Sequence, residues 1–357
     1  MQRTSVNIRS AAMAVQFLAL VILITACSDD DAVCPCNQTP EALASAGPFL
    51  YDGSYSDPIG PFRITDLRSN LQVVDGDTVD TYAQMEDYET RNLSVYYPEG
   101  ASEAPVVFYI HGGGWTDGYM EWYDFVAESF TRQKGWVTVV INYRLTSDQV
   151  FPTAICSTRT SEAPDPSLKA AWYPDNLDDC ANALQWTIEN ITTYGGDPAK
   201  IFLFGHSAGA HLATLLAAHG DYADLRSRIR GLISMSGGYR LTELNPAIFA
   251  SALEQTFGTA TDEAILDSAS PTTYLTGAET LFPMLLLYAA DDLPSLSEQA
   301  IAFSEKLVRL GYDHELQRLE EYGHVSEVQA FEFADEEPTQ LVIGFIEGVL
   351  GAASDGP

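Results

Sequence analysis

Positive charge is scarce in this sequence. Eighteen Lys and Arg residues stand against 50 Asp and Glu residues, which gives a formal net charge of −32 over 357 residues. Only four of the basic residues are lysines, and the acidic residues are spread along the chain instead of forming one tail. Because such a surface repels nucleic-acid phosphates and anionic lipid headgroups, we expect no nucleic-acid partner.

Cysteine is also rare, and the motifs of common cofactor sites are missing. No spacing among the five cysteines suits zinc, so no metal site is expected. Cys156 and Cys180 flank a polar, proline-containing segment, and a disulfide closing that loop is the preferred pairing, although spacing leaves other connectivities open. Neither G-K-[ST] nor a dinucleotide fingerprint is present, so no nucleotide cofactor is expected.

The first residues resemble a secretory signal. They are basic, continue into an apolar run over residues 11–26, and end in small residues before Cys27. This run is shorter than a membrane span, which needs about 20 residues. Residues 24–27 resemble a bacterial lipobox, which makes Cys27 a candidate lipidation site; an ordinary signal peptide or an uncleaved anchor stays open. In each case we expect an exported protein, a cell-envelope lipoprotein or a secreted one, with no other membrane contact.

The rest of the chain divides into a tether, an extension and one catalytic domain. Residues 28–50 are predicted to be a flexible tether and residues 51–87 an N-terminal extension. From 88 to 351, short apolar β-rich runs alternate with longer helix-like segments, which is typical of an α/β sheet. An insertion at about 153–175 is interpreted as a cap-like loop, and residues 352–357 form a tail.

The hydrophobic pattern places the elements of this domain. The predicted strands are 93–98, 106–111, 136–144, 201–204, 231–237, 283–289 and 314–319. The predicted helices are 123–135, 176–191, 298–311 and 341–351, with a further alanine- and leucine-rich helix after residue 207.

Ser207 is the predicted nucleophile. It lies in a G-x-S-x-G motif, GHSAG, between an apolar strand and a helix, which is the context that this motif requires. Glycines are needed at 205 and 209 because side chains in so sharp a turn would collide with the neighbouring strand and helix. The start of the helix adds its positive dipole end, and the amide of Ala208 is placed to meet a developing oxyanion.

A second glycine-rich motif, HGGGW, occupies residues 111–115. Three consecutive glycines after a strand let backbone N–H groups approach a substrate oxygen with no Cβ in the way, as an oxyanion hole requires. The order of the two motifs, HGGGW upstream of GHSAG, favours acyl transfer.

Three histidines crowd around Ser207, but none of them suits the role of its base. His206 is adjacent, yet the turn directs its side chain away from the nucleophile, so a packing role is predicted. His211 and His219 recede along the helix, where core or surface positions are expected.

The predicted base is His324. His111 begins the glycine loop, and His314 opens a strand at the edge opposite the site. His324 instead follows a late strand, at the carboxyl edge of the sheet where Ser207 emerges. The acid should lie between serine and histidine in the chain, and Asp291 and Asp292 follow the preceding strand; the sequence alone does not separate them.

These segments together resemble the α/β-hydrolase fold, and more narrowly secreted feruloyl-esterase-like proteins, hormone-sensitive-lipase-like esterases and kynurenine formamidases. The resemblance covers roughly residues 88–350 and implies a mostly parallel central sheet flanked by helices. Relatives carry their acid about seven residues before a glutamine, and counting back from Gln299 selects Asp292. In the lipase-like relatives the second and third loop glycines bind the oxyanion, here Gly113 and Gly114, together with Ala208.

The activity implied is ester hydrolysis through an acyl-enzyme, with Ser207, Asp292 and His324 as the triad. The expected substrate is a small-molecule ester with a small acyl, an aryl or a carbohydrate-linked group, and no cofactor is needed. An arylformamidase-like amide hydrolase would use the same residues, and a catalytically inactive binding module is a third reading. The sequence leaves the oligomeric state open.

Overall fold

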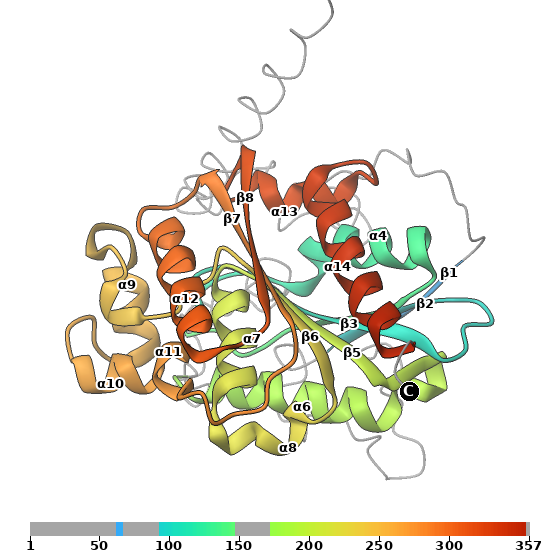
Figure 1. The fold of residues 1–357 in the computed structure, drawn as a ribbon, viewed down its shortest axis with the longest axis horizontal. Helices are drawn as coiled ribbons and strands as arrows, with labels where there is room; N and C mark the ends of the chain where they lie inside the picture. The colour runs from blue at the N-terminus through green and yellow to red at the C-terminus, as the bar shows by residue number, and fades with distance from the viewer. Residues whose placement is uncertain (1–61, 67–92, 147–171, 355–357) are drawn as a thin grey trace, which may run out of the picture.

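A single eight-stranded sheet organises the protein. The computed structural model describes residues 62–66, 93–146 and 172–354, drawn in colour in Figure 1. In spatial order the sheet runs β1-β2-β4-β3-β5-β6-β7-β8. The strands are β1 (Phe62–Asp66), β2 (Leu93–Pro98), β3 (Ala104–Ile110), β4 (Val137–Ile141), β5 (Gly196–His206), β6 (Ile229–Met235), β7 (Met284–Asp291) and β8 (His314–Gly323).

Strand β2 runs antiparallel to both of its neighbours, and β4, β3, β5, β6, β7 and β8 pair in parallel. The parallel strands therefore end at one common edge. The mostly parallel α/β sheet expected from the sequence is confirmed, and each of the seven predicted strands corresponds to one of β2 to β8. Strand β1 comes from the predicted extension and adds one more strand beside β2.

Helices cover both faces of the sheet (Figure 1). The longer ones are α4 (Asp124–Lys134), α6 (Asp175–Asn190), α7 (Ala208–Ala218), α9 (Pro246–Phe257), α12 (Leu296–Leu310) and α14 (Glu337–Ser354). Shorter ones are α8 (Ala223–Arg226), α10 (Glu263–Ser268), α11 (Pro271–Tyr274) and α13 (Ser326–Gln329). The four helices predicted at 123–135, 176–191, 298–311 and 341–351 are confirmed as α4, α6, α12 and α14.

The central strand β5 shows how the two layers form. Its alternate side chains point to opposite faces, as the pleat of a strand requires. Ile201 and Leu203 pack into the core beneath α6, α7 and α12, and Phe202 and Phe204 pack into the core beneath α4, α13 and α14. Because both faces are buried over residues 201–204, this part of the strand is apolar without interruption instead of alternating.

Five helices were not expected. Two of them, α8 and α13, have four residues each, and the other three, α9, α10 and α11, lie in sequence between β6 and β7. Local signals were present for these three: Asn245 and Asp262 cap α9 and α10 with their side chains, and α9 and α11 carry proline in the first turn. Helices α10 and α11 have six and four residues, too few to show an apolar period, whereas α9 has 12.

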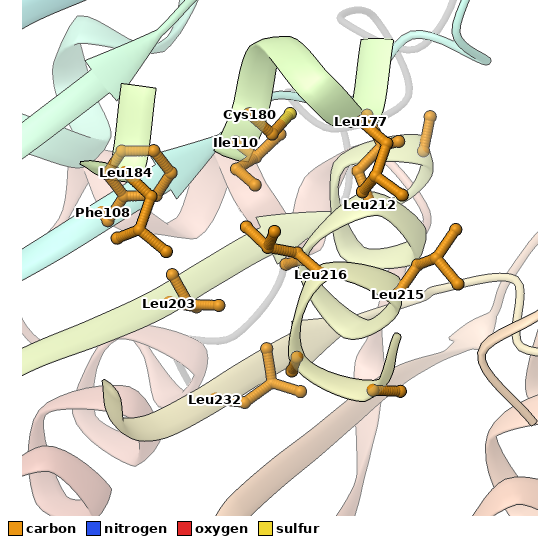
Figure 2. Close-up of a cluster of buried hydrophobic side chains, with 14 of the residues drawn as sticks. Phe108, Ile110, Leu177, Cys180, Leu184, Leu203, Leu212, Leu215, Leu216 and Leu232 are labelled. Carbon is orange, nitrogen blue, oxygen red and sulfur yellow. The ribbon is translucent and has the colours of Figure 1, made fainter. Parts of the chain in front are cut away.

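Cys180 differs from its prediction. It is a free thiol, wholly buried on α6 beside Ile110 and Leu177 (Figure 2). In that position it packs as a small apolar side chain. The predicted Cys156–Cys180 disulfide is therefore not formed in the structure, and Cys156 itself lies outside the described residues.

Several other predictions also fall outside them: the signal segment with Cys27, the tether, most of the extension, the 153–175 insertion and the end of the tail. Among the residues that are described, no helix combines the length and apolar character that crossing a membrane requires.

Candidate active site

Ser207 sits at a sharp turn between β5 and α7. Its backbone angles are φ 56° and ψ −119°, a strained conformation for a residue with a side chain. A Cβ on residue 205 would lie 2.3 Å from the carbonyl oxygen of Gly209, and one on residue 209 would lie 2.1 Å from that of Ile110 in β3. The predicted reason for glycine at both positions, collision with the helix and the neighbouring strand, is confirmed.

The turn presents the Ser207 hydroxyl to His324, which follows β8. The Nε2 atom of His324 lies 2.9 Å from Oγ of Ser207. The side chain of His324 is 12% exposed, so one edge of the ring remains open to solvent. The structure thus brings together two residues 117 positions apart.

Asp292 holds the other side of the imidazole. Its Oδ1 atom lies 2.7 Å from Nδ1 of His324. It also accepts hydrogen bonds from the Ser236 hydroxyl, at 2.7 Å, and from the backbone N–H of Leu293, at 2.7 Å. Asp291, the other predicted candidate, has an exposed side chain at the end of β7.

The electrostatics favour an ionised Asp292. Burial of this carboxyl opposes ionisation, but the hydrogen bond and the charge interaction with His324, with the bonds from Ser236 and Leu293, outweigh it and lower the pKa of Asp292. A carboxylate can only accept, so Nδ1 of His324 carries the hydrogen and Nε2 is left as an acceptor. This arrangement can remove the proton of Ser207.

The glycine loop lies directly against this serine. A Cβ on Gly112 would come within 3.1 Å of Cβ of Ser207. Gly113 and Gly114 both adopt positive φ, 126° and 61°. A Cβ on Gly113 would lie 1.9 Å from the backbone oxygen of Asp117, so only glycine fits there.

Hydrogen bonds to His211 of α7 and to Thr146 anchor this loop through Trp115. Trp115, itself at φ 62°, donates from Nε1 to Nδ1 of His211 at 3.1 Å. The other ring nitrogen of His211 bonds the carbonyl of Ala269 at 2.8 Å. The backbone oxygen of Trp115 accepts from Thr146. His211 is thus a core histidine, as predicted, and its two bonds tie the loop to α7.

The start of α7 completes this part of the site. Ala208 is the first residue of an 11-residue helix, and its amide belongs to the turn that carries Ser207. Free amides at a helix start favour negative charge. Ala208 and the glycine loop therefore flank the same hydroxyl.

The remaining histidines lie mostly where the sequence placed them. His314 begins β8, at the opposite end from His324. His219 follows the last residue of α7 and contacts Tyr222 and Tyr274. His111 is buried and stacks on Tyr143.

His206 is a partial exception. It is buried, as a packing residue would be, but its Nε2 atom also lies 2.9 Å from the backbone oxygen of His324. The prediction that its side chain merely packs was therefore incomplete.

Two residues near the triad were missed by sequence reasoning. Ser236 follows β6, the strand between β5 and β7, so a search of every carboxyl strand end would have found it. Glu327 lies three positions after His324, is wholly buried and has no sequence signal that separates it from a solvated acid.

Potential metal ligands gather at one place in the described part of the chain: His206, His324 and Glu327, with ligand atoms within 4.8 Å of one another. Both ring nitrogens of His324 already bond Asp292 and Ser207. A metal there would have to displace one of those partners, so the donor set does not fit a resident ion.

Comparison with known proteins identifies the family. The model of the carboxylesterase family matches residues 85–264, about half of the chain. A probable carboxylic ester hydrolase, LipM, of Mycobacterium tuberculosis is 29% identical over 218 residues, which are 57% of this chain and 45% of that protein. A probable isoprenylcysteine alpha-carbonyl methylesterase of Arabidopsis thaliana is 26% identical over 250 residues, 63% of this chain and 46% of that protein. The chain thus spans about half the length of these curated relatives.

Solved structures show the same fold. An esterase of Pyrobaculum calidifontis superposes with a TM-score of 0.61 at 20% identity, covering 88% of this chain and 92% of that one. Esterase B from Lactobacillus Rhamnosis has a TM-score of 0.64 at 18% identity, with 96% of each chain covered. The sheet order, the flanking helices and these likenesses establish the α/β-hydrolase fold. With the family match over both glycine motifs, the chain belongs to the carboxylesterase family.

Proposed function

We propose that this protein is a serine hydrolase that cleaves carboxylic esters through an acyl-enzyme, with Ser207 as nucleophile, His324 as base and Asp292 as the acid that orients it. The observation that carries the proposal is the continuous set of contacts from Asp292 through His324 to Ser207, 2.7 Å and 2.9 Å long. Family membership supports the same reaction class.

The reaction proceeds in two steps. The Oγ atom of Ser207 attacks the ester carbonyl while Nε2 of His324 takes its proton. The amides of Gly113, Gly114 and Ala208 are proposed to bind the oxyanion, each donor typically contributing about 100- to 1000-fold to turnover. His324 then returns the proton to the leaving alkoxide. Water, deprotonated by His324, attacks the acyl-enzyme and releases the carboxylic acid.

The proposed substrates are esters with a small acyl, an aryl or a carbohydrate-linked group. The family match and a relative described as a probable carboxylic ester hydrolase support the ester class, and the narrower range rests on the resemblance seen in the sequence. The sequence expectation of an exported protein supports a further proposal, that the enzyme acts outside the cytoplasmic membrane, anchored through lipid on Cys27 or secreted. Labelling with an alkyne fatty acid tests the anchor: Cys27→Ser should lose all label, and retained label would contradict it.

A fluorophosphonate probe tests the reaction class. Wild type should take one label per chain and hydrolyse p-nitrophenyl acetate. Ser207→Ala should take none, and His324→Ala should react far more slowly because no base activates the serine. A wild type that takes no label contradicts the proposal.

An ester panel of increasing acyl length then defines the substrate range. N-formylkynurenine serves as the competing substrate, and faster turnover of this amide than of p-nitrophenyl acetate would favour the arylformamidase-like reading.

A further inference from the structure

We propose that His206, the residue before the nucleophile, is a positioning residue for the catalytic base: its ring holds the backbone of His324 so that the imidazole of His324 stays aligned with Ser207. This inference rests on the proposed function. It assigns a role in the reaction to His206, a side chain outside the triad.

The contact itself is a well-formed hydrogen bond. The Nε2 atom of His206 lies 2.9 Å from the carbonyl oxygen of His324. A carbonyl oxygen can only accept, so Nε2 of His206 carries the hydrogen and donates it. The two rings also lie against each other, with centroids 4.8 Å apart and planes tilted by 39°. His206 therefore touches His324 through both its backbone and its ring.

The position of His206 in the chain makes this contact informative. It is the last residue of β5, directly before Ser207 at the strained turn. The His324 backbone that it holds belongs to the loop after β8, three strands away in the sheet. One side chain thus couples the turn carrying the nucleophile to the loop carrying the base, across 118 residues of sequence.

Glu327 closes the far side of this contact. Its Oε1 atom lies 3.4 Å from Nε2 of His206, and its side chain is wholly buried. Neither carboxyl oxygen has a hydrogen-bond partner within the part of the chain that the structure describes. Burial lowers the pKa of His206 to about 4 and raises that of Glu327 well above its usual range, so burial favours the uncharged form of both groups.

A neutral His206 suits a place beside the base. When His324 takes the serine proton it becomes positively charged, and a charged ring 4.8 Å away would oppose that step. A neutral donor instead holds the loop without adding charge. Misplacing a catalytic group by about 1 Å can lower the rate about 100-fold, so the loss of this hydrogen bond should appear in kcat.

The test compares three substitutions at this position. His206→Gln keeps an N–H that can reach the His324 carbonyl, His206→Asn carries its amide one methylene short, and His206→Leu has no donor. His219→Leu, at the far end of α7, is the matched control. Each variant is measured for kcat and KM with p-nitrophenyl acetate, for the rate of fluorophosphonate labelling, and for its thermal unfolding midpoint.

We expect His206→Leu and His206→Asn to lower kcat and the labelling rate about 10- to 100-fold, with KM within about threefold of wild type. His206→Gln should recover kcat to within about fivefold, and His219→Leu should match wild type. Should Leu fail to fold, the Gln and Asn pair carries the comparison, because both keep a polar amide.

Two results overturn the inference: a folded Leu or Asn variant with wild-type kcat, or a Gln variant as slow as Asn. A wild type that neither takes the label nor hydrolyses any ester refutes the proposed function, and this inference with it. An active wild type whose His206 variants are equally active refutes the inference alone.

Discussion

The two halves of the site are held by different forces. On the nucleophile side, the backbone sets the position of Ser207: its turn is strained, its side chain makes no capping bond to α7, and the glycines at 205 and 209 admit no Cβ. On the acid and base side, Asp292 and His324 are oriented by side-chain hydrogen bonds that come from the ends of different strands.

The two halves of the site should therefore respond differently to substitution. Backbone sterics limit the turn itself: a Cβ on residue 205 would meet Gly209 within the motif, and one on residue 209 would meet Ile110 of the neighbouring strand β3. A hydrogen-bonded network depends on side chains that meet only after the sheet has formed, and each member can be removed without disturbing the backbone. Substitutions of the turn glycines should therefore affect mainly stability, whereas substitutions of the serine, the acid or the base should affect mainly rate.

The largest expected effect comes from the serine itself. Ser207→Ala should lower kcat at least about 10⁴-fold because no nucleophile remains. Ser207→Gly should be equally inactive but more stable than the alanine variant by about 1–2 kcal/mol, because glycine tolerates φ 56° without strain. Ester hydrolysis and urea unfolding measure the two effects. Equal stability of the two variants would show that the turn stores no strain.

The two aspartates provide the next comparison. Asp292→Asn should lower kcat about 10³- to 10⁴-fold, because an amide cannot hold the imidazole in the tautomer that receives the serine proton. Asp291→Asn, with an exposed side chain, should stay within about twofold of wild type. Steady-state kinetics at neutral pH decide between them, and equal, mild losses would remove both from the site.

Two glycine substitutions test whether backbone sterics shape the nucleophile side of the site. Gly209→Ala should destabilise the protein by at least about 3 kcal/mol, since its Cβ would lie 2.1 Å from a backbone oxygen of β3. Gly100→Ala is the control: it has positive φ, but nothing lies within 4 Å of the added Cβ, so a cost of about 1 kcal/mol is expected. Similar losses in urea unfolding would contradict the steric account.

At Glu327 we expect a pH-dependent effect on stability with little change in activity. Burial raises the pKa of Glu327 well above its ordinary value of 4.5, although the charge on His324 lowers it. The folded state therefore keeps a proton that the unfolded chain releases. The stability that this group contributes is present below about pH 4.5 and is lost as the pH rises.

Glu327→Gln should remove that loss while leaving kcat within about threefold of wild type. Relative to wild type, its free energy of unfolding should rise with pH from 5 to 8, by at most about 1.4 kcal/mol per pH unit. Urea unfolding at several pH values measures this. A difference that does not vary with pH would mean that Glu327 is ionised in the folded protein.

Much of the fold was predictable from the sequence because most of its strands, though not the partly exposed β8, are buried on both faces, and its long helices show clear apolar periodicity. Helices α10 and α11 were not predicted because six and four residues are too few to show an apolar period; their local signals are the Asp262 cap and a proline in the first turn. The disulfide prediction was wrong because Cys180 faces the core from α6, an orientation that loop spacing does not reveal.

The site, like the fold, was predictable from the sequence only in part. Ser207 and its glycines were predicted from local pattern, and His324 from its place after a late strand; the structure brings them within hydrogen-bonding distance, and their catalytic roles stay predictions until tested. The local sequence did not separate Asp291 from Asp292, because both residues lie at the end of the same strand. The sequence pattern does not show which of the two side chains faces His324.

By itself, the sequence determined the turn at Ser207 and the glycine loop from their motifs, and the strand ends from which the partners come from the apolar pattern, because each of these signals lies within a few neighbouring residues. Only the tertiary structure decided that Asp292 reaches His324, that Ser236 bonds Asp292, and that His206 bonds the His324 backbone instead of merely packing. Those contacts join residues far apart in the chain. Their distances and angles exist only once the sheet has set the strand ends side by side.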